Sequence, residues 1–501
     1  CCMVTMISLS AILWSPWLWI GLITCFIYKN LWRGMDYFEK RGIPHEKTVP
    51  LFGNTWKMWK RDLLEEDVEK LKKFGTIWGE INGLRKTWVV ADPELIKKIY
   101  VKEFESFSAR MNFFTGSNKY VERFLSVISG PAWRDIRNAV SPGFSSGKIK
   151  NMSYLMQECT DTLLESFQSN SVDGSVMLKK LYASFTLDIV ASCAFGTKID
   201  SLKSPDNEFS NHIKNIFKGF VETPLMILPF LIGERIRRIL PSALDKKALD
   251  FFTNVVKAIL QARRNDPSNR NDFLDVLLET KKSSSKHKEV LDEVTITSQA
   301  ILFFLAGFET TGATMTYLTY SLATNPEKQD KLYREIIRVK KENGKLDHES
   351  IHQIKYLDAC INESLRLYTV GGRLERQVTK TITIDGYTFE EGTSVMIPVY
   401  AMHHDENYFE NPYEYIPERF FTMDKEILNS VWMPFGIGPR NCVGMRFALE
   451  EIKFGICNLL LKFKFGKCTN TPDRLQFMKG AFGTMLKEVE VKIEPRLESE
   501  D

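Results

Sequence analysis

Hydrophobic and polar residues follow three different patterns along the chain. Residues Ile7 to Tyr28 form an uncharged run rich in Leu, Ile and Trp, which at about 1.5 Å per residue is long enough to cross a bilayer. β-Branched alternation appears in short pieces near Thr76–Val90 and Val378–Ile397, and helical periodicity dominates from about residue 150 onward. The pattern predicts a mainly helical domain with small β-sheets, preceded by one transmembrane helix.

The flanks of the apolar run predict its orientation. Basic residues follow the run, beginning with Lys29 and Arg33, so the rest of the chain should be cytosolic. A cleaved signal peptide is the alternative, but no basic segment precedes the run and no small-residue cleavage site follows it. Because the chain starts at Cys1, we expect it to be incomplete or processed at this end. We expect a transmembrane anchor, a basic and proline-containing linker, and one large domain over residues 1–28, 29–54 and 55–501, respectively.

Composition and charge narrow the class of protein. With 501 residues, of which 44% are hydrophobic, the chain can bury a very large core. Its 67 basic and 63 acidic residues give a net charge of +4, which is too balanced for a nucleic-acid-binding surface, so we expect no nucleic-acid partner. The nine cysteines lack the spacing of a zinc site or a disulfide scaffold, and they indicate reduced thiols in a cytosol-facing protein.

One cysteine lies in a segment with chemistry of its own. Residues Pro434 to Gly444 read PFGIGPRNCVG and lead directly into an amphipathic run that ends at Leu461. Glycines let the backbone approach a flat ligand closely. A helix that starts just after Cys442 offers free amides and a positive dipole end, which favour a thiolate over a thiol. The segment predicts an iron ligand, and a buried structural cysteine is the alternative from the residues alone.

The segment resembles the haem-binding signature of the cytochrome P450 family at five positions, Phe435, Gly438, Arg440, Cys442 and Gly444. By that resemblance, Cys442 is the thiolate ligand of a haem b iron and favours cleavage of the dioxygen bond, while Phe435 contacts the haem. The implied fold buries the haem between a long distal helix and a proximal cysteine loop and helix. None of the seven histidines lies in this loop or in an obvious apolar helix, so a histidine-ligated haem is not suggested.

Charged residues elsewhere gain roles from the same resemblance. Glu363 and Arg366 are three residues apart and share a helix face, a spacing that alone indicates a surface ion pair. The family joins such a pair to a second arginine, here Arg419, in a buried network behind the cysteine loop. The two haem carboxylates need cations and hydrogen-bond donors. Any one arginine would be an ordinary surface residue without its motif, but the resemblance implies these candidates: Arg440, Arg376, Trp133, Arg137 and Arg110.

An acid and two threonines interrupt an otherwise apolar helical run from about Thr297 to Leu322. A buried helix rarely carries such residues without reason. In the family, this motif lines the distal haem face, where small residues such as Ala306 leave room for dioxygen and Glu309 and Thr310 relay protons. The alternative is that Thr310 bonds to a carbonyl one turn earlier and that the neighbouring glycine only packs.

The resemblance extends to the animal microsomal branch of xenobiotic oxidisers, represented by family 3 and the insect families 6 and 9. The chain departs from that branch where Thr369 replaces a frequent proline and Gly371 and Gly372 replace bulkier residues. The segment Val221–Pro241 should dip into the membrane near a substrate entrance, or it is a buried core segment. Apolar pocket walls, for which ordinary core is the alternative, are expected at Phe113, Phe114, Phe303, Phe304, Val370, Gly371, Gly372 and Phe482.

The resemblance implies a monooxygenase of the endoplasmic reticulum membrane. It would insert one oxygen atom from O2 into lipophilic small molecules such as xenobiotics, steroids or other lipids. Its electrons would come from NADPH through cytochrome P450 reductase, with cytochrome b5 as a second candidate donor. An isomerase or dehydratase that needs no outside electrons is one alternative, but such enzymes lack the acid–threonine pair. A noncatalytic membrane haem-binding protein is the other.

Overall fold

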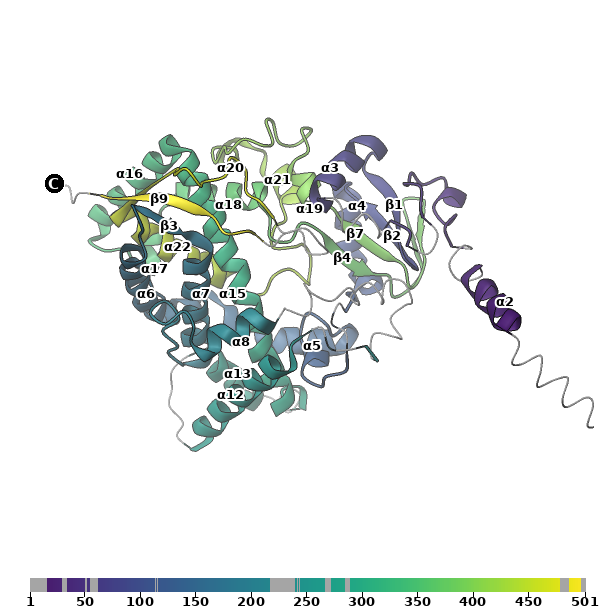
Figure 1. The fold of residues 1–501 in the computed structure, drawn as a ribbon, viewed down its shortest axis with the longest axis horizontal. Helices are drawn as coiled ribbons and strands as arrows, with labels where there is room; N and C mark the ends of the chain where they lie inside the picture. The colour runs from purple at the N-terminus through teal and green to yellow at the C-terminus, as the bar shows by residue number, and fades with distance from the viewer. Residues whose placement is uncertain are drawn as a thin grey trace, which may run out of the picture.

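A helical region and a smaller β-rich region form the body of the molecule in the computed structural model (Figure 1). The expected pocket residues Phe113 and Phe482, and nearly all of the segment 221–241, lie outside the described part of the chain. The structure describes residues 16–28, 34–49, 52–54, 62–112, 114, 116–216, 239–240, 242, 244–265, 272–283, 289–477 and 486–496.

The helical region contains the long helices from α6 (Ser146–Ser169) onward, as the helical periodicity from about residue 150 predicts. Two predicted helices are confirmed, because the runs 297–322 and 445–461 lie within α15 and α22. The helices and short helical turns of this region are η6 (Val121–Arg123), α5 (Gly130–Val140), η7 (Ser141–Phe144), α6 (Ser146–Ser169), α7 (Leu178–Phe195), α8 (Glu208–Ile216), α12 (Lys246–Asn265), α13 (Phe273–Ser283), α15 (Glu293–Thr324), α16 (Pro326–Asn343), α17 (His348–Ile351), α18 (Lys355–Leu367), α20 (Arg419–Thr422) and α22 (Met445–Lys462).

The β-rich region is built on a four-stranded sheet in the order β1 (Ile77–Asn82), β2 (Arg85–Val90), β7 (Ser394–Ile397) and β4 (Leu374–Gln377). Strands β1 and β2 form an antiparallel hairpin, and β2 pairs with β7 in parallel. The short helices of this region are η2 (Glu39–Arg41), α3 (Leu63–Phe74), α4 (Pro93–Lys97), η4 (Lys98–Lys102), η5 (Phe104–Phe107), α19 (Val399–His403) and α21 (Lys425–Val431).

The remaining strands form two smaller sheets. One has the order β3 (Ser175–Met177), β9 (Glu490–Pro495) and β8 (Phe463–Gly466), so it pairs the C-terminal strand with the segment before α7. The other is the hairpin of β5 (Ile382–Ile384) and β6 (Tyr387–Phe389). The alternating segments of the sequence therefore form strands at both expected places, and the prediction of small sheets is confirmed.

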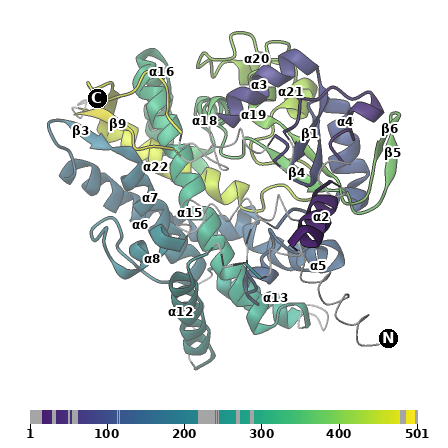
Figure 2. The same ribbon diagram turned by 45° about the vertical axis from the view of Figure 1, so that its right-hand side comes forward.

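Helix α15 crosses the centre of the molecule (Figure 2) and packs along α7, with α22 and α18 against its other faces. Its first turn is capped by Asp292, whose carboxylate accepts from the Thr295 amide at 2.7 Å. Among the described residues it is the one helix that is long and apolar enough to cross a membrane, yet 61% of its apolar window is buried inside the protein. Its apolar character follows from packing on several sides.

Helix α2 (Pro16–Ile27) is the described part of the expected anchor and is set apart from the body, on the side of the β1–β2 hairpin (Figure 1). Its side chains are mostly exposed, and Trp17 is 79% exposed. Its 12 residues span about 18 Å, and the preceding residues of the apolar run lie outside the described part.

Candidate active site

A cavity of about 480 Å³ lies between α15 and the cysteine loop. Helix α5 and the start of α22 also contribute to its walls, together with residues 370–374. Most of the lining is apolar, and the polar exceptions cluster around Cys442, around the arginines and along α15. Such a mixture of an apolar wall and few convergent polar groups is typical of a small-molecule site.

The cysteine loop is held by short-range hydrogen bonds and by a close contact with η4. The Cys442 amide donates to the Phe435 carbonyl at 2.8 Å, which closes the loop on itself. Gly438 has φ +73°, and a Cβ there would lie 2.1 Å from the Tyr100 carbonyl oxygen, so only glycine fits. The loop thereby presents the Cys442 side chain to the cavity, so its accessible surface faces the cavity while protein atoms surround it.

Opposing effects act on the pKa of the Cys442 thiol. Burial raises the pKa of its thiol above the ordinary value, and this effect outweighs the amides of Gly444 and Met445 and the positive charge of Arg137, which lower it. The start of α22 therefore favours the thiolate in the expected direction but does not by itself produce it. A cation bonded to the sulfur would shift this balance, because a coordinating thiol is deprotonated.

Arg110, Arg137 and Arg440 line the cavity, and Arg376 lies close enough for its charge to act on Arg110 and Arg440. Arg137 donates to the carbonyl and side-chain oxygens of Asn441 at 3.0 and 2.9 Å. Arg110 donates to the Arg440 carbonyl at 2.9 Å, and the Arg440 guanidinium lies 4.5 Å from the Trp133 ring centroid. Among the described atoms, the buried nitrogens of this group without a hydrogen-bond partner are Arg376 Nε, Arg440 Nε and Arg440 Nη1.

In the described part of the chain, no ion pair neutralises the arginine cluster, Arg110, Arg137, Arg376 and Arg440, although the nearby charge of Glu375 acts on Arg376. Burial and the nearby charges of Arg376 and Arg137 lower the pKa of Arg440 to about 9. Burial, with Arg376 and Arg440 next, lowers the pKa of Arg110 well below its ordinary value. Unpartnered donors and mutual repulsion in a buried site call for an anionic ligand. The two carboxylates of a haem fit this requirement, with Cys442 available for its iron.

The motif on α15 presents one face to the cavity at helical spacing: Phe303, Ala306, Gly307, Thr310, Thr311 and Thr314. Ala306 and Thr310 are exposed there, although most of the helix is buried. The Thr310 hydroxyl donates to the Ala306 carbonyl at 2.6 Å, which is the backbone bond named as the alternative. A hydroxyl oxygen also has lone pairs that can accept, so this bond leaves Thr310 able to hold a water in the cavity.

Glu309 and Gly307 have surroundings that the motif alone did not reveal. Glu309 is not among the described residues that line the cavity. Its carboxylate pairs with the Lys179 ammonium of α7 at 3.2 Å, and its side chain is 35% exposed. A Cβ at Gly307 would lie 2.8 Å from Val190 Cγ2, so this glycine also permits the close packing of α15 on α7.

The residues Glu363, Arg366 and Arg419 form a buried ion-pair network. Arg366 donates from Nε and Nη2 to the two Glu363 carboxylate oxygens at 2.7 and 2.9 Å, and Arg419 Nε donates to Oε1 at 3.1 Å. The remaining Arg366 donors reach the carbonyls of His403, Pro412 and Glu414. All donor groups of Arg366 are thus paired inside the chain.

Sequence reasoning missed His403, which links this network to the cysteine loop. Its carbonyl accepts from Arg366, and its ring Nε2 accepts from the Met433 amide at 3.1 Å, just before the loop. Burial, followed by the Arg366 charge, lowers the pKa of His403 well below its ordinary value, so the ring stays neutral and able to accept. The His–His pair at 403–404 carries no motif that would have revealed this contact.

The expected pocket walls divide into two groups. Phe303, Val370 and Gly371 line the cavity. Phe304 instead lies in the core, 1% exposed, with its ring 5.4 Å from Phe195 and 5.0 Å from Phe252. Gly372 packs on Leu64, and its carbonyl accepts from the Tyr400 amide. Phe114 packs against Phe124 at 6.0 Å. Unpredicted apolar lining residues include Leu302, Phe144 and Leu374.

Comparisons with known proteins bear on the whole chain. The family model described as Cytochrome P450 matches residues 43–494. The chain is 33% identical to Cytochrome P450 3A14 of Cavia porcellus over 495 residues, which cover 97% of each protein. It is 32% identical to Cytochrome P450 3A41 of Mus musculus over 97% of the chain and 98% of the relative. It is 33% identical to Cytochrome P450 3A1 of Rattus norvegicus over the same shares.

Proposed function

Because this chain belongs to the cytochrome P450 family and is a haem-dependent monooxygenase, we propose that it oxidises lipophilic small molecules in the cavity between α15 and the cysteine loop. The observation that carries this proposal is the arginine cluster, in which Arg376 Nε, Arg440 Nε and Arg440 Nη1 lack partners among the described atoms, while Cys442 lines the same cavity as Arg440. We assign Cys442 as the iron ligand. The haem, when bound, supplies the activation of dioxygen.

The residues of the cavity would have different roles in binding the haem and the substrate. The arginine cluster and Trp133 would hold and orient the haem carboxylates through charge-assisted hydrogen bonds. Phe435 and Ala306 would contact the haem from the proximal and distal sides. Phe303, Val370 and Gly371 would bind apolar substrate and exclude water, since the cavity wall is mainly apolar. Lipophilic xenobiotics, steroids and other lipids are the substrate class that matches this lining.

Thr310 is proposed as the catalytic proton donor. Its hydroxyl lies on the cavity face of α15 and can hold a water or pass on a proton at Oγ1. Glu309 would connect this position to solvent, because its carboxylate is partly exposed and pairs with Lys179 at the surface end of α7. The Lys179 partner regulates that route in this proposal, since the ion pair must open for Glu309 to carry a proton.

The membrane arrangement and the electron donor complete the proposal. Residues 1–28 would anchor the protein once in the endoplasmic reticulum membrane, followed by the linker 29–54 and the haem-thiolate catalytic domain 55–501 on the cytosolic face. The exposed apolar side chains of α2 support the anchor, and the segment 221–241 would be a second membrane contact. Electrons would come from NADPH through cytochrome P450 reductase, with cytochrome b5 as a further donor.

The test measures both the haem spectrum and the formation of oxidised product. Purified full-length protein is reconstituted with reductase and NADPH, and a panel of lipophilic compounds is screened for shifts of the haem spectrum and for oxidised products. We expect product that depends on both NADPH and O2. Cys442→Ser should remove the red-shifted Soret band of the reduced, carbon monoxide-bound protein, because a neutral hydroxyl is a poor iron ligand. A Cys442→Ser protein that keeps this band would refute the assignment of the ligand.

A further inference from the structure

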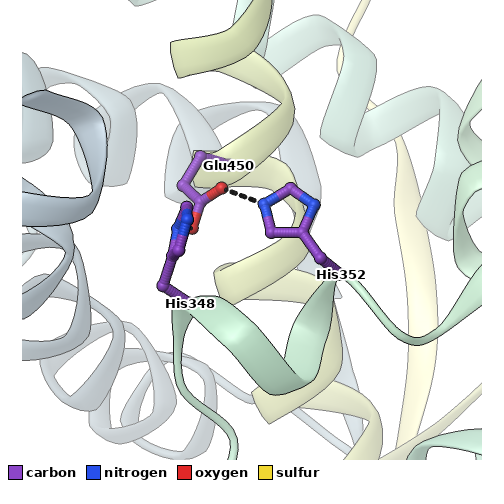
Figure 3. Close-up of side chains that lie close together, drawn as sticks. All are labelled: His348, His352 and Glu450. Carbon is purple, nitrogen blue, oxygen red and sulfur yellow. Dashed lines mark hydrogen bonds and ion pairs between the residues drawn. The ribbon is translucent and has the colours of Figure 1, made fainter. Parts of the chain in front are cut away.

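Two histidines and a glutamate lie together outside the cavity, where α17 packs on α22 (Figure 3). His348 begins α17, His352 caps its end, and both imidazoles point toward the carboxylate of Glu450 on α22. His348 Nδ1 lies 2.6 Å from Glu450 Oε1, and His352 Nε2 lies 2.8 Å from Oε2. The three potential ligand atoms all lie within 4.8 Å of one another.

We propose that His348, His352 and Glu450 bind a divalent cation of the zinc class, independently of the haem site. Two imidazole nitrogens and one carboxylate oxygen are a ligand set that zinc prefers, with a water in the fourth position. At metal–ligand distances of about 2.0 Å, tetrahedral ligand atoms lie about 3.3 Å apart, so shifts of under about 1.5 Å would complete the site. His352 is 45% exposed, which gives a cation a path from solvent.

The charge around Glu450 supports a cation. Its side chain is 2% exposed, so the carboxylate is buried beside two imidazoles that each donate one hydrogen when neutral. Neutral imidazoles satisfy the oxygen atoms by hydrogen bonds but do not cancel the buried negative charge, which only a protonated imidazole or a bound cation would do. A bound dication would compensate it directly.

The position of Lys453 disfavours metal binding at this site, so a substitution of Lys453 tests the proposal. Its ammonium lies 3.2 Å from His352 Nδ1 and 2.6 Å from Asp358 Oδ1. An imidazole that binds metal through Nε2 carries its proton on Nδ1, where Lys453 would then face it donor to donor. Binding therefore requires Lys453 to withdraw toward Asp358, and removal of its charge should strengthen binding.

The position of the site suggests its consequence. Helix α22 begins at Met445, directly after the cysteine loop, and Glu450 lies in its second turn. A cation bound by Glu450 and the two histidines would link α22 to α17. Because the ligand set exists only in the folded chain, bound zinc should raise the unfolding midpoint of the holoprotein.

The experiment measures zinc binding to the full-length holoprotein by competition with a fluorescent chelator at neutral pH. We expect one zinc ion per chain at this site. His348→Ala and His352→Ala should each lower its affinity at least about 10-fold, since loss of even an outer partner of a metal site costs 10- to 100-fold. Lys453→Met should raise the affinity, and the zinc-dependent rise of the unfolding midpoint should be smaller in both histidine variants.

His212→Ala is the matched control, because His212 also pairs with a glutamate one helical turn away, Glu208 at 3.9 Å. It should leave zinc affinity unchanged. The carbon monoxide spectrum of each variant verifies the fold, and the exposed position of His352 keeps its variant informative if His348→Ala fails to fold. Equal zinc binding in wild type and both histidine variants, or the absence of stoichiometric binding, would overturn the proposal and leave a hydrogen-bonded contact between two helices.

Discussion

Two groups of buried arginines differ in where their partners lie. In the ion-pair network, every donor group of Arg366 reaches Glu363 or a backbone carbonyl. In the arginine cluster, Arg440 is similarly buried, yet only Nη2 has a partner among the described atoms, the Ile128 carbonyl. Both arginines are therefore buried, but only Arg366 has a hydrogen-bond partner for every donor group. Buried charges whose partners all lie within the chain stabilise the fold, whereas buried charges with unpaired donors at a cavity are suited to bind a ligand.

The largest expected effect falls on the ion-pair network. Arg366→Met leaves Glu363 buried with Arg419 as its remaining arginine and should cost about 3–5 kcal/mol of unfolding free energy. Urea unfolding of the holoprotein measures this loss. Arg338→Met is the control, because its pair with Glu342 at 2.9 Å is exposed and should contribute at most about 0.5 kcal/mol. Equal losses in the two variants would show that the buried network stabilises the fold no more than an exposed ion pair does.

The same distinction applies to hydroxyl groups on α15. Thr310 and Thr316 both donate to the carbonyl four residues earlier, but Thr310 faces the cavity and Thr316 is fully buried. Thr310→Ala should lower product formation about 100-fold while NADPH consumption continues and hydrogen peroxide accumulates. Thr316→Ala should keep the ratio of product to NADPH. A normal ratio in Thr310→Ala would mean that its hydroxyl only bonds to its own helix.

Removal of a charge from the arginine cluster should weaken haem binding and spare the fold. Arg440→Met retains an apolar contact with Trp133 but deletes donors for a haem carboxylate. Hydrogen bonds to charged groups contribute about 1.5–3 kcal/mol, so haem should dissociate about 10- to 100-fold faster into an acceptor protein. The apoprotein should be no less stable than wild type to urea, because a repelling charge is gone. Loss of apoprotein stability comparable to Arg366→Met would contradict this.

The sequence was sufficient for the elements that surround the cavity. Periodicity located α15 and α22 to within a few residues, and alternation located β1, β2 and β7 of the main sheet but not β4, which precedes the expected segment. It was insufficient for choosing among neighbouring apolar residues. Phe303 and Phe304 lie on different faces of α15, but the helix is apolar on several sides, so no pattern tells which face meets the cavity and which meets the core.

Long-range contacts account for the other differences. Glu309 pairs with Lys179, which is 130 residues away in sequence, and His403 connects Arg366 with Met433. Neither contact has a local spacing. The Cys442 thiol shows a second kind of limit, because the helix start is visible in the sequence whereas the degree of burial, which dominates its pKa, is not.

The smallest expected effect concerns the pH dependence of the apoprotein. Burial and the charges of Arg376 and Arg137 lower the pKa of Arg440 to about 9 in the folded chain, from 12.5 for the free group. Below pH 9 both folded and unfolded chains hold this proton, and the folded chain bears the full cost of the buried charge. As the pH rises above 9, the folded chain releases the proton while the unfolded chain keeps it, so this group should stabilise the fold progressively. The urea midpoint of the wild-type apoprotein, relative to Arg440→Met at each pH, should therefore rise between about pH 8 and pH 10. The holoprotein should lack this relative rise, because the haem carboxylates compensate the charge. A rise of equal size with and without haem would show that the haem carboxylates do not compensate the Arg440 charge, and no rise in either form would show that the arginine cluster is balanced by the chain itself, as the ion-pair network is.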